Sequence, residues 1–181
     1  MAYSLNEMKN NKFEYFLNAI LYCLYLNEVW SNRKIDKIVN TIIPRAMKAK
    51  LNQQEKKEAE DLKYGNEAGL SIGVANHLYG LFYTGYPSFL SFVLLGIADG
   101  GAKRTNMALV AILVAIPIGF FYIPAYKAVF SNDRYLEYFK QFEKEDEQWH
   151  RKWKRRTIAF CVGSVVFFLS GIFAMWWVGH L

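Results

Sequence analysis

A chain of 181 residues has room for one helical membrane unit with a modest cytosolic part, which excludes two independent globular domains. Hydrophobic residues make up 53% of the chain and aromatic residues 17%, so the composition is a poor match for a soluble protein. The net charge of +6 does not by itself indicate nucleic-acid binding. The basic residues are concentrated beside apolar segments, where anionic lipid headgroups are the expected partner, and we expect no nucleic-acid partner.

Three apolar segments of about 20 residues are predicted to span a membrane: Leu78–Ala98, Met107–Tyr126 and Ile158–Val178. The stretch before the first segment contains 11 lysines and arginines, and the stretch between the second and third contains nine. The loop between the first two contains only Lys103 and Arg104, and the tail after the third contains none. Because basic residues accumulate on the cytoplasmic side, we expect an integral protein of the cytoplasmic (inner) membrane, with its N-terminus inside and its C-terminus outside.

The first predicted element is Phe13–Trp30, which is compatible with a helix but contains only about 12 cleanly apolar residues. Because a span needs about 20, we predict a buried or interfacial helix and keep a fourth span as the alternative. Ser31 is predicted to cap a separate helix, whose apolar side chains recur at helical spacing until Pro44 kinks or ends it. The charged segment 51–64 is predicted to form a solvated helix.

No aspartate, glutamate, lysine or arginine occurs from Ala68 to Ala98. A helix of this length exceeds the hydrocarbon core of about 30 Å, so we predict that it begins in the cytosolic part and enters the bilayer near Leu78. The alternative is a tilted helix that is broken at Pro87. Asn76 and His77 then either cap the cytoplasmic end of the span or, within the bilayer, form a polar gate, since polar residues in spans are costly and usually functional.

Small residues recur in the second and third spans at four-residue spacing. Small side chains let two helices approach closely, so we predict that five residues form contacts between helices or subunits: Ala111, Ala115, Gly119, Gly163 and Ser170. The second span also contains Pro117 and Pro124, and prolines are tolerated in spans where neighbouring groups satisfy the freed carbonyl oxygens.

Residues 127–157 are predicted to form one amphipathic helix that is capped by Ser131 or Asn132 and continues into the third span. Its aromatic residues fall close to one stripe: Tyr135, Tyr138, Phe139, Phe142, Trp149 and Trp153. The basic cluster near its end, together with the interleaved Trp153, is predicted to bind anionic lipid headgroups: Arg151, Lys152, Lys154, Arg155 and Arg156.

No motif in the chain predicts catalysis, and we expect neither an enzyme nor a cofactor or metal site. Glu147 and His150 form the only Glu-x-x-His pair, whereas di-metal sites in helical bundles require such a pair on each of two helices. Cys23 and Cys161 are far apart in the expected topology, so both are predicted to pack rather than to form a disulfide.

The predicted fold is all-α, with three transmembrane helices, or four if Phe13–Trp30 spans. Its parts are a cytosolic or interfacial helical region (1–77), a transmembrane hairpin (78–126), a cytosolic basic and aromatic helix (127–157) and a third span with an external C-terminus (158–181).

Three spans cannot enclose an aqueous path by themselves, so the first functional hypothesis is a homo-oligomer that forms a pore or channel gated by its cytosolic layer. The alternative is a non-conducting, membrane-anchored accessory subunit, for example of a defence (antiphage) or secretion system, that recruits a cytosolic protein. Convergence of the hydroxyl residues of the spans on an axis would favour the pore, whereas contacts within one chain would favour the accessory subunit: Thr84, Ser88, Ser91, Ser164 and Ser170.

Overall fold

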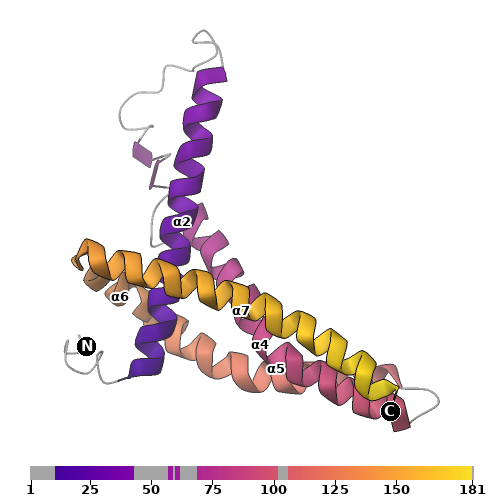
Figure 1. The fold of residues 1–181 in the computed structure, drawn as a ribbon. Helices are drawn as coiled ribbons and strands as arrows, with labels where there is room; N and C mark the ends of the chain where they lie inside the picture. The colour runs from indigo at the N-terminus through magenta and orange to yellow at the C-terminus, as the bar shows by residue number, and fades with distance from the viewer. Residues whose placement is uncertain (1–10, 43–56, 59, 62–68, 102–105, 181) are drawn as a thin grey trace.

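The computed structural model describes residues 11–42, 57, 58, 60, 61, 69–101 and 106–180, and every regular element within them is helical. The elements are α2 (Lys12–Ile42), α4 (Leu70–Gly101), α5 (Met107–Phe130), the short 3-10 helix η2 (Ser131–Asp133), α6 (Arg134–Phe142) and α7 (Glu147–Gly179). Figure 1 shows α4, α5 and α7 running side by side, with α2 crossing them near one end. The all-α prediction is confirmed for these residues.

Three helices, α4, α5 and α7, are long and apolar enough to cross a membrane, and they contain the three predicted spans. α4 has 32 residues and begins at Leu70, well before the predicted entry point at Leu78. It continues through Pro87 without interruption, so the alternative of a helix broken at this proline is wrong. A helix of this length extends for about 48 Å at 1.5 Å per residue, which exceeds a hydrocarbon core of about 30 Å.

Glycines on both α4 and α7 bring the backbones of these two helices close together. A β-carbon added to Gly85 would overlap the Ser164 hydroxyl, and one added to Gly96 would lie 2.7 Å from the Met175 carbonyl oxygen. Gly171 of α7 has the same relation to α4, because its added β-carbon would lie 2.9 Å from the nearest backbone atom there. This is the close packing that small residues permit between membrane helices.

α5 contacts a roughly opposite side of α4, over a smaller area. The Ser91 hydroxyl donates to the Val114 carbonyl oxygen (3.2 Å), and the Tyr83 hydroxyl donates to the Phe121 carbonyl oxygen (3.3 Å). α5 buries few side chains and exposes most of its apolar surface: the buried ones are Pro117, Ala125 and Val129. α4 therefore lies between α5 and α7 in a single layer, as Figure 1 shows.

α2 is a single helix that passes through the protein where the other helices converge. All nine residues from Leu17 to Tyr25 are buried, and nine consecutive residues point in every direction around a helix. α4, α5, α6 and α7 all contact α2, so this segment is enclosed by protein. α2 is not among the three helices that are long and apolar enough to span a membrane. The prediction of a non-spanning helix requires this.

The predicted break at Ser31 is wrong, because α2 continues through it to Ile42. Side chains bridge the expected break: the Asn32 amide donates to the Glu28 carboxylate at 2.9 Å, and the Lys34 ammonium lies 3.8 Å from the centre of the Trp30 ring. These i, i+4 contacts stabilise a continuous helix. Pro44 lies outside the described residues, and of segment 51–64 only residues 57, 58, 60 and 61 are described, all of them helical and exposed.

The prediction of one helix over residues 127–157 is also wrong, because the chain turns between α6 and α7. Asp146 accepts a hydrogen bond from the Trp149 backbone N–H (2.7 Å) and so caps α7 at its start. The turn folds α6 against α7 and stacks the Phe142 and Trp149 rings, whose centroids lie 4.8 Å apart. At the other end of α6 the N-cap is Asp133, in a left-handed conformation, rather than Ser131 or Asn132.

Polar contacts fix α2 to this folded corner. The Glu14 carboxylate accepts from the Arg134 guanidinium (3.2 Å), and the Trp149 indole donates to the Tyr15 hydroxyl (2.9 Å). The Asn18 amide reaches the last turns of α5, where it donates to the Ala128 carbonyl oxygen (3.4 Å). α2, α6 and residues 147–157 of α7 thus share one aromatic core, which we term the surface unit.

Candidate functional site

Asn76 and His77, the predicted gate residues, lie in a groove between α4 and α5, which we term the α4–α5 groove. Its volume is about 520 Å³. The lining residues come from both helices: Gly73, Asn76, His77, Gly80, Leu81, Thr84, Tyr122, Tyr126 and Phe130. The absence of a side chain at Gly80 keeps it open beside Tyr122, because an added β-carbon would lie 3.2 Å from that hydroxyl.

The two predicted gate residues differ in their surroundings. The Asn76 side-chain oxygen is buried and has no hydrogen-bond partner among the described residues, whereas the His77 side chain is exposed. The Thr84 hydroxyl donates to the Leu81 carbonyl oxygen at 3.0 Å, so its proton is already used within α4. A buried acceptor without a donor is costly, and a water molecule or polar ligand group in the groove would satisfy it.

Four of the five predicted packing residues face away from the other helices of this chain. Ala111, Ala115 and Ser170 are exposed, and no heavy atom lies within 4 Å of a β-carbon added to Gly119. Gly163 alone is in a close contact, because its added β-carbon would lie 2.7 Å from the Tyr86 hydroxyl of α4. The close contacts between α4 and α7 instead involve mainly other glycines, which the four-residue spacing did not identify.

The predicted lipid-binding cluster surrounds a tryptophan that is itself buried. Trp153 is 5% exposed and packs against aromatic rings of α2, including those of Tyr15 and Phe16. The Arg156 guanidinium lies 4.8 Å from the centre of the Trp153 ring. The five basic side chains are exposed: Arg151, Lys152, Lys154, Arg155 and Arg156.

A second groove, which the sequence did not reveal, lies where α2 crosses α7, and we term it the α2–α7 groove. Its volume is about 370 Å³. It combines apolar and basic side chains from segments about 120 positions apart: Cys23, Leu26, Asn27, Trp30, Glu147, His150, Arg151 and Lys154. Burial raises the pKa of the Cys23 thiol to about 11, which disfavours the reactive thiolate at neutral pH. The signal available in the sequence was Trp30 followed one helical turn later by Lys34.

A third groove, of about 510 Å³, is lined almost wholly by apolar and aromatic side chains. They come from all four long helices: Phe16, Tyr83, Tyr86, Pro87, Phe89, Leu90, Phe121 and Phe160. Such a surface offers no charged group for chemistry and suits hydrocarbon chains.

The hydroxyl groups of the spans are used mainly inside the chain. Ser88 donates to the Thr84 carbonyl oxygen (2.7 Å), and Ser91 donates across to α5. Ser164 is buried against Gly85 of α4. Of the five hydroxyl residues, Ser170 is the only exposed one.

Among the described residues, no group of three or more histidine, cysteine or acidic side chains is placed to hold a metal ion. Glu147 and His150 do share the α2–α7 groove, but the Glu147 carboxylate pairs with Arg151 (2.7 Å), and Nδ1 of His150 lies 2.8 Å from the Asp146 carbonyl oxygen. Comparisons of the chain with protein-family models, with curated proteins and with solved structures give no match.

Proposed function

We propose that the chain is an integral membrane protein that holds the surface unit at the cytoplasmic face of the membrane, as an attachment point for a cytosolic protein. In this proposal α4, α5 and α7 are the membrane anchor, and the protein does not conduct by itself. The N-terminal end of α7 belongs to the surface unit and its C-terminal part to the anchor, so one unbroken helix joins the two.

The observation that carries the proposal is the placement of the span hydroxyls. Ser88, Ser91 and Ser164 are engaged or buried in contacts within α4 or between α4 and its neighbours. The outward surfaces of the anchor are therefore overwhelmingly apolar, with large exposed side chains such as Phe120 and Phe173. A surface of this kind suits lipid rather than an aqueous path.

Potassium flux from liposomes tests whether the protein conducts by itself. Purified protein is reconstituted at low and at high protein-to-lipid ratio, with empty liposomes as the negative control and an ionophore as the positive control. We expect no protein-dependent flux at either ratio. Flux that grows with the protein content would overturn the non-conducting assignment.

The α4–α5 groove favours a second candidate function, a pore built from several copies. Its unpartnered Asn76 oxygen and exposed His77 would face a shared axis in a ring, and the outward small residues of α5 would pack between copies. Native mass spectrometry in mild detergent separates the candidates. A closed ring, together with flux that is altered in His77→Ala at unchanged expression, would favour the pore, and a monomer would eliminate it.

A further inference from the structure

We propose that the α2–α7 groove binds the headgroup of an anionic phospholipid of the cytoplasmic leaflet. The lipid phosphate lies beside Lys154, and the glycerol and upper acyl chains lie along Trp30 and Leu26. The proposal rests on the membrane anchoring proposed above. The sequence predicted a diffuse basic cluster on α7. The proposed site is instead a single groove that also includes residues of α2, which the sequence had not connected with lipid.

The position of the groove along α7 matches the headgroup layer. Lys154 lies one turn, about 6 Å, before Ile158, where the apolar segment begins. The polar layer of a bilayer adds about 5–8 Å on each side of the hydrocarbon core. Cys23 of α2 lines the same groove and lies next to Thr157, so α2 crosses α7 at this level.

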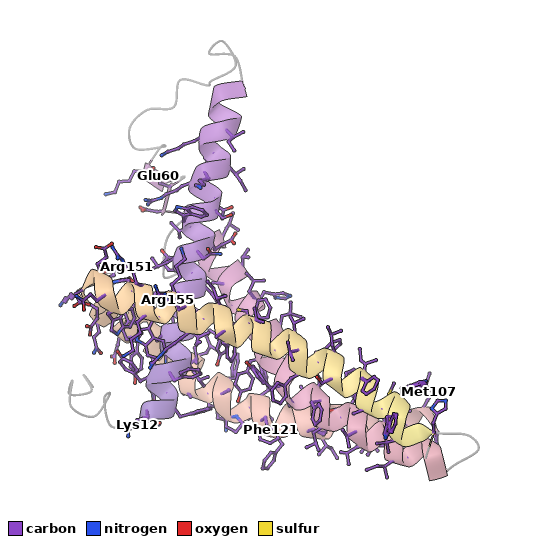
Figure 2. All side chains as sticks on the ribbon, in the orientation of Figure 1. Lys12, Glu60, Met107, Phe121, Arg151 and Arg155 are labelled. Carbon is purple, nitrogen blue, oxygen red and sulfur yellow. The ribbon has the colours of Figure 1, made fainter. Side chains whose placement is uncertain are left out.

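The view with side chains shows where the basic residues lie in the fold. Figure 2 shows Arg151 and Arg155 near the crossing of α7 and α2, at the end of the helix layer that lies away from Met107. Because Arg151 lines the groove, the groove lies at this end of the anchor. In the proposed topology this is the cytoplasmic end, within reach of the phosphates of that leaflet.

Among the groups that line the groove, Lys154 is the one best placed to bind an anion. Arg151 is already paired with Glu147, and Nδ1 of His150 is occupied by a backbone carbonyl oxygen. No carboxylate among the described residues forms a salt bridge with Lys154. A lysine ammonium is a compact point charge with three donors, which suits a phosphate group.

The apolar wall of the groove explains why the ligand is a lipid rather than a free phosphate. Trp30 is 56% exposed and Leu26 is 36% exposed, an arrangement that is unfavourable in water. Tryptophan is favoured at the membrane interface, where its ring packs against the glycerol region and its N–H reaches the polar layer. The Lys34 ammonium over the Trp30 ring adds a second cation at the same place.

Two lysines on α7 provide a matched test. Lys152 and Lys154 are both exposed, but two residues of a helix differ by about 200°, so only Lys154 faces the groove. Native mass spectrometry follows the binding of dioctanoyl phosphatidylglycerol and dioctanoyl phosphatidylcholine to the full chain in mild detergent. We expect wild type to prefer phosphatidylglycerol, Lys154→Gln to weaken its binding about fivefold, and Lys152→Gln to leave it unchanged. Trp30→Ala should weaken the binding of both lipids.

Three outcomes would overturn the lipid site. Equal losses in the two lysine variants would mean that diffuse surface charge attracts the lipid. Glycerol phosphate that competes as well as the lipid would mean a site for free phosphate. A wild type without preference between the two lipids would mean no anionic site at all.

Two controls separate the failure of the site from other failures. Circular dichroism of each variant shows whether it folds. Alkaline carbonate extraction of membranes tests the anchoring on its own, because an integral protein stays in the pellet. Retention in the pellet without a preference for phosphatidylglycerol would sink the lipid site alone, whereas release into the supernatant would sink the anchoring as well.

Discussion

At the scale of a single residue, two glycines, one in α4 and one in α5, have opposite surroundings, and this difference is measurable. A β-carbon at Gly96 would lie 2.7 Å and 3.0 Å from backbone atoms of Met175, which cannot rotate away. We expect Gly96→Ala to lower the free energy of unfolding by about 1–3 kcal/mol, because α4 and α7 must separate. Thermal unfolding in detergent, followed by circular dichroism, measures the change.

Gly119 of α5 supplies the matched control, because nothing lies within 4 Å of an added β-carbon there. Gly119→Ala should leave stability unchanged or raise it by up to about 1 kcal/mol, since alanine is the better helix former. If Gly96→Ala proved as harmless as Gly119→Ala, the close contact of α4 with α7 would be wrong.

At the scale of elements, the corner between α6 and α7 depends on one aromatic residue. Phe142 is fully buried, and its ring lies 4.8 Å from that of Trp149 and 5.2 Å from that of Tyr15. We expect Phe142→Ala to cost about 3–5 kcal/mol, because it leaves a cavity where α2, α6 and α7 meet. Phe120→Ala on the exposed side of α5 removes the same side chain and should cost far less. Chemical unfolding of the two variants gives the comparison, and similar losses would contradict the packing of this corner.

The segment of α2 that is enclosed by protein makes the surface unit sensitive to alkali. Burial raises the pKa of the Cys23 thiol to about 11 and that of the Tyr22 phenol to about 12, from 9.0 and 10.0. Well below pH 9 both groups are protonated in the folded and the unfolded chain, so their contribution to stability is constant. Between pH 9 and 12 the unfolded chain loses these protons first, and the free energy of unfolding therefore falls.

The double variant Tyr22→Phe/Cys23→Ala tests this dependence, because neither replacement ionises. It is expected to be less stable than wild type at neutral pH, where a cavity remains at Cys23, yet to lose less stability between pH 9 and 12. Urea unfolding at several pH values, followed by circular dichroism, gives both slopes. Parallel curves for the two proteins would show that these groups do not ionise on unfolding.

The elements differ in how far the sequence predicts them, and the reasons are physical. Long apolar runs predict α4, α5 and α7, because a span requires a continuous apolar surface. The turn between α6 and α7 cannot be recognised from the aromatic pattern. Phe142 and Trp149 are seven residues apart, and this spacing continues the aromatic stripe of one helix across the turn. Asp146, three residues before Trp149, was the available sign of a new helix start.

The contacts between helices are harder still to read from the sequence. Gly85 and Gly96 are 11 residues apart, which is three turns, so they share one side of α4 without a four-residue pattern. The α2–α7 groove joins residues about 120 positions apart, and no local pattern reports on such a meeting. The sequence predicted the basic half of this groove and the helical character of α2, but not that the two meet.

At the scale of the whole molecule, the charge distribution and the three apolar helices predict one topology. The surface unit contains the basic residues of α6 and of the start of α7. The rest of α7 carries no lysine or arginine, and none occurs from Thr157 to His180. A three-span protein has its two ends on opposite sides of the membrane. If α2 spanned as well, its first residue Lys12 would lie on the side of the C-terminal end.

Cysteine labelling resolves this topology and the alternative of a fourth span together. Single cysteines at Lys12, Lys140 and His180, in a Cys23→Ala/Cys161→Ala background, are treated with an impermeant maleimide in sealed vesicles whose cytoplasmic face points outward. We expect the cysteines at 12 and 140 to react at once, and the one at 180 only after permeabilisation, because α7 carries it across and basic residues stay inside. Protection at 12 together with 180 would establish a spanning α2. Immediate reaction at all three positions would mean that α7 does not cross, and the anchoring proposal would then fail with the topology.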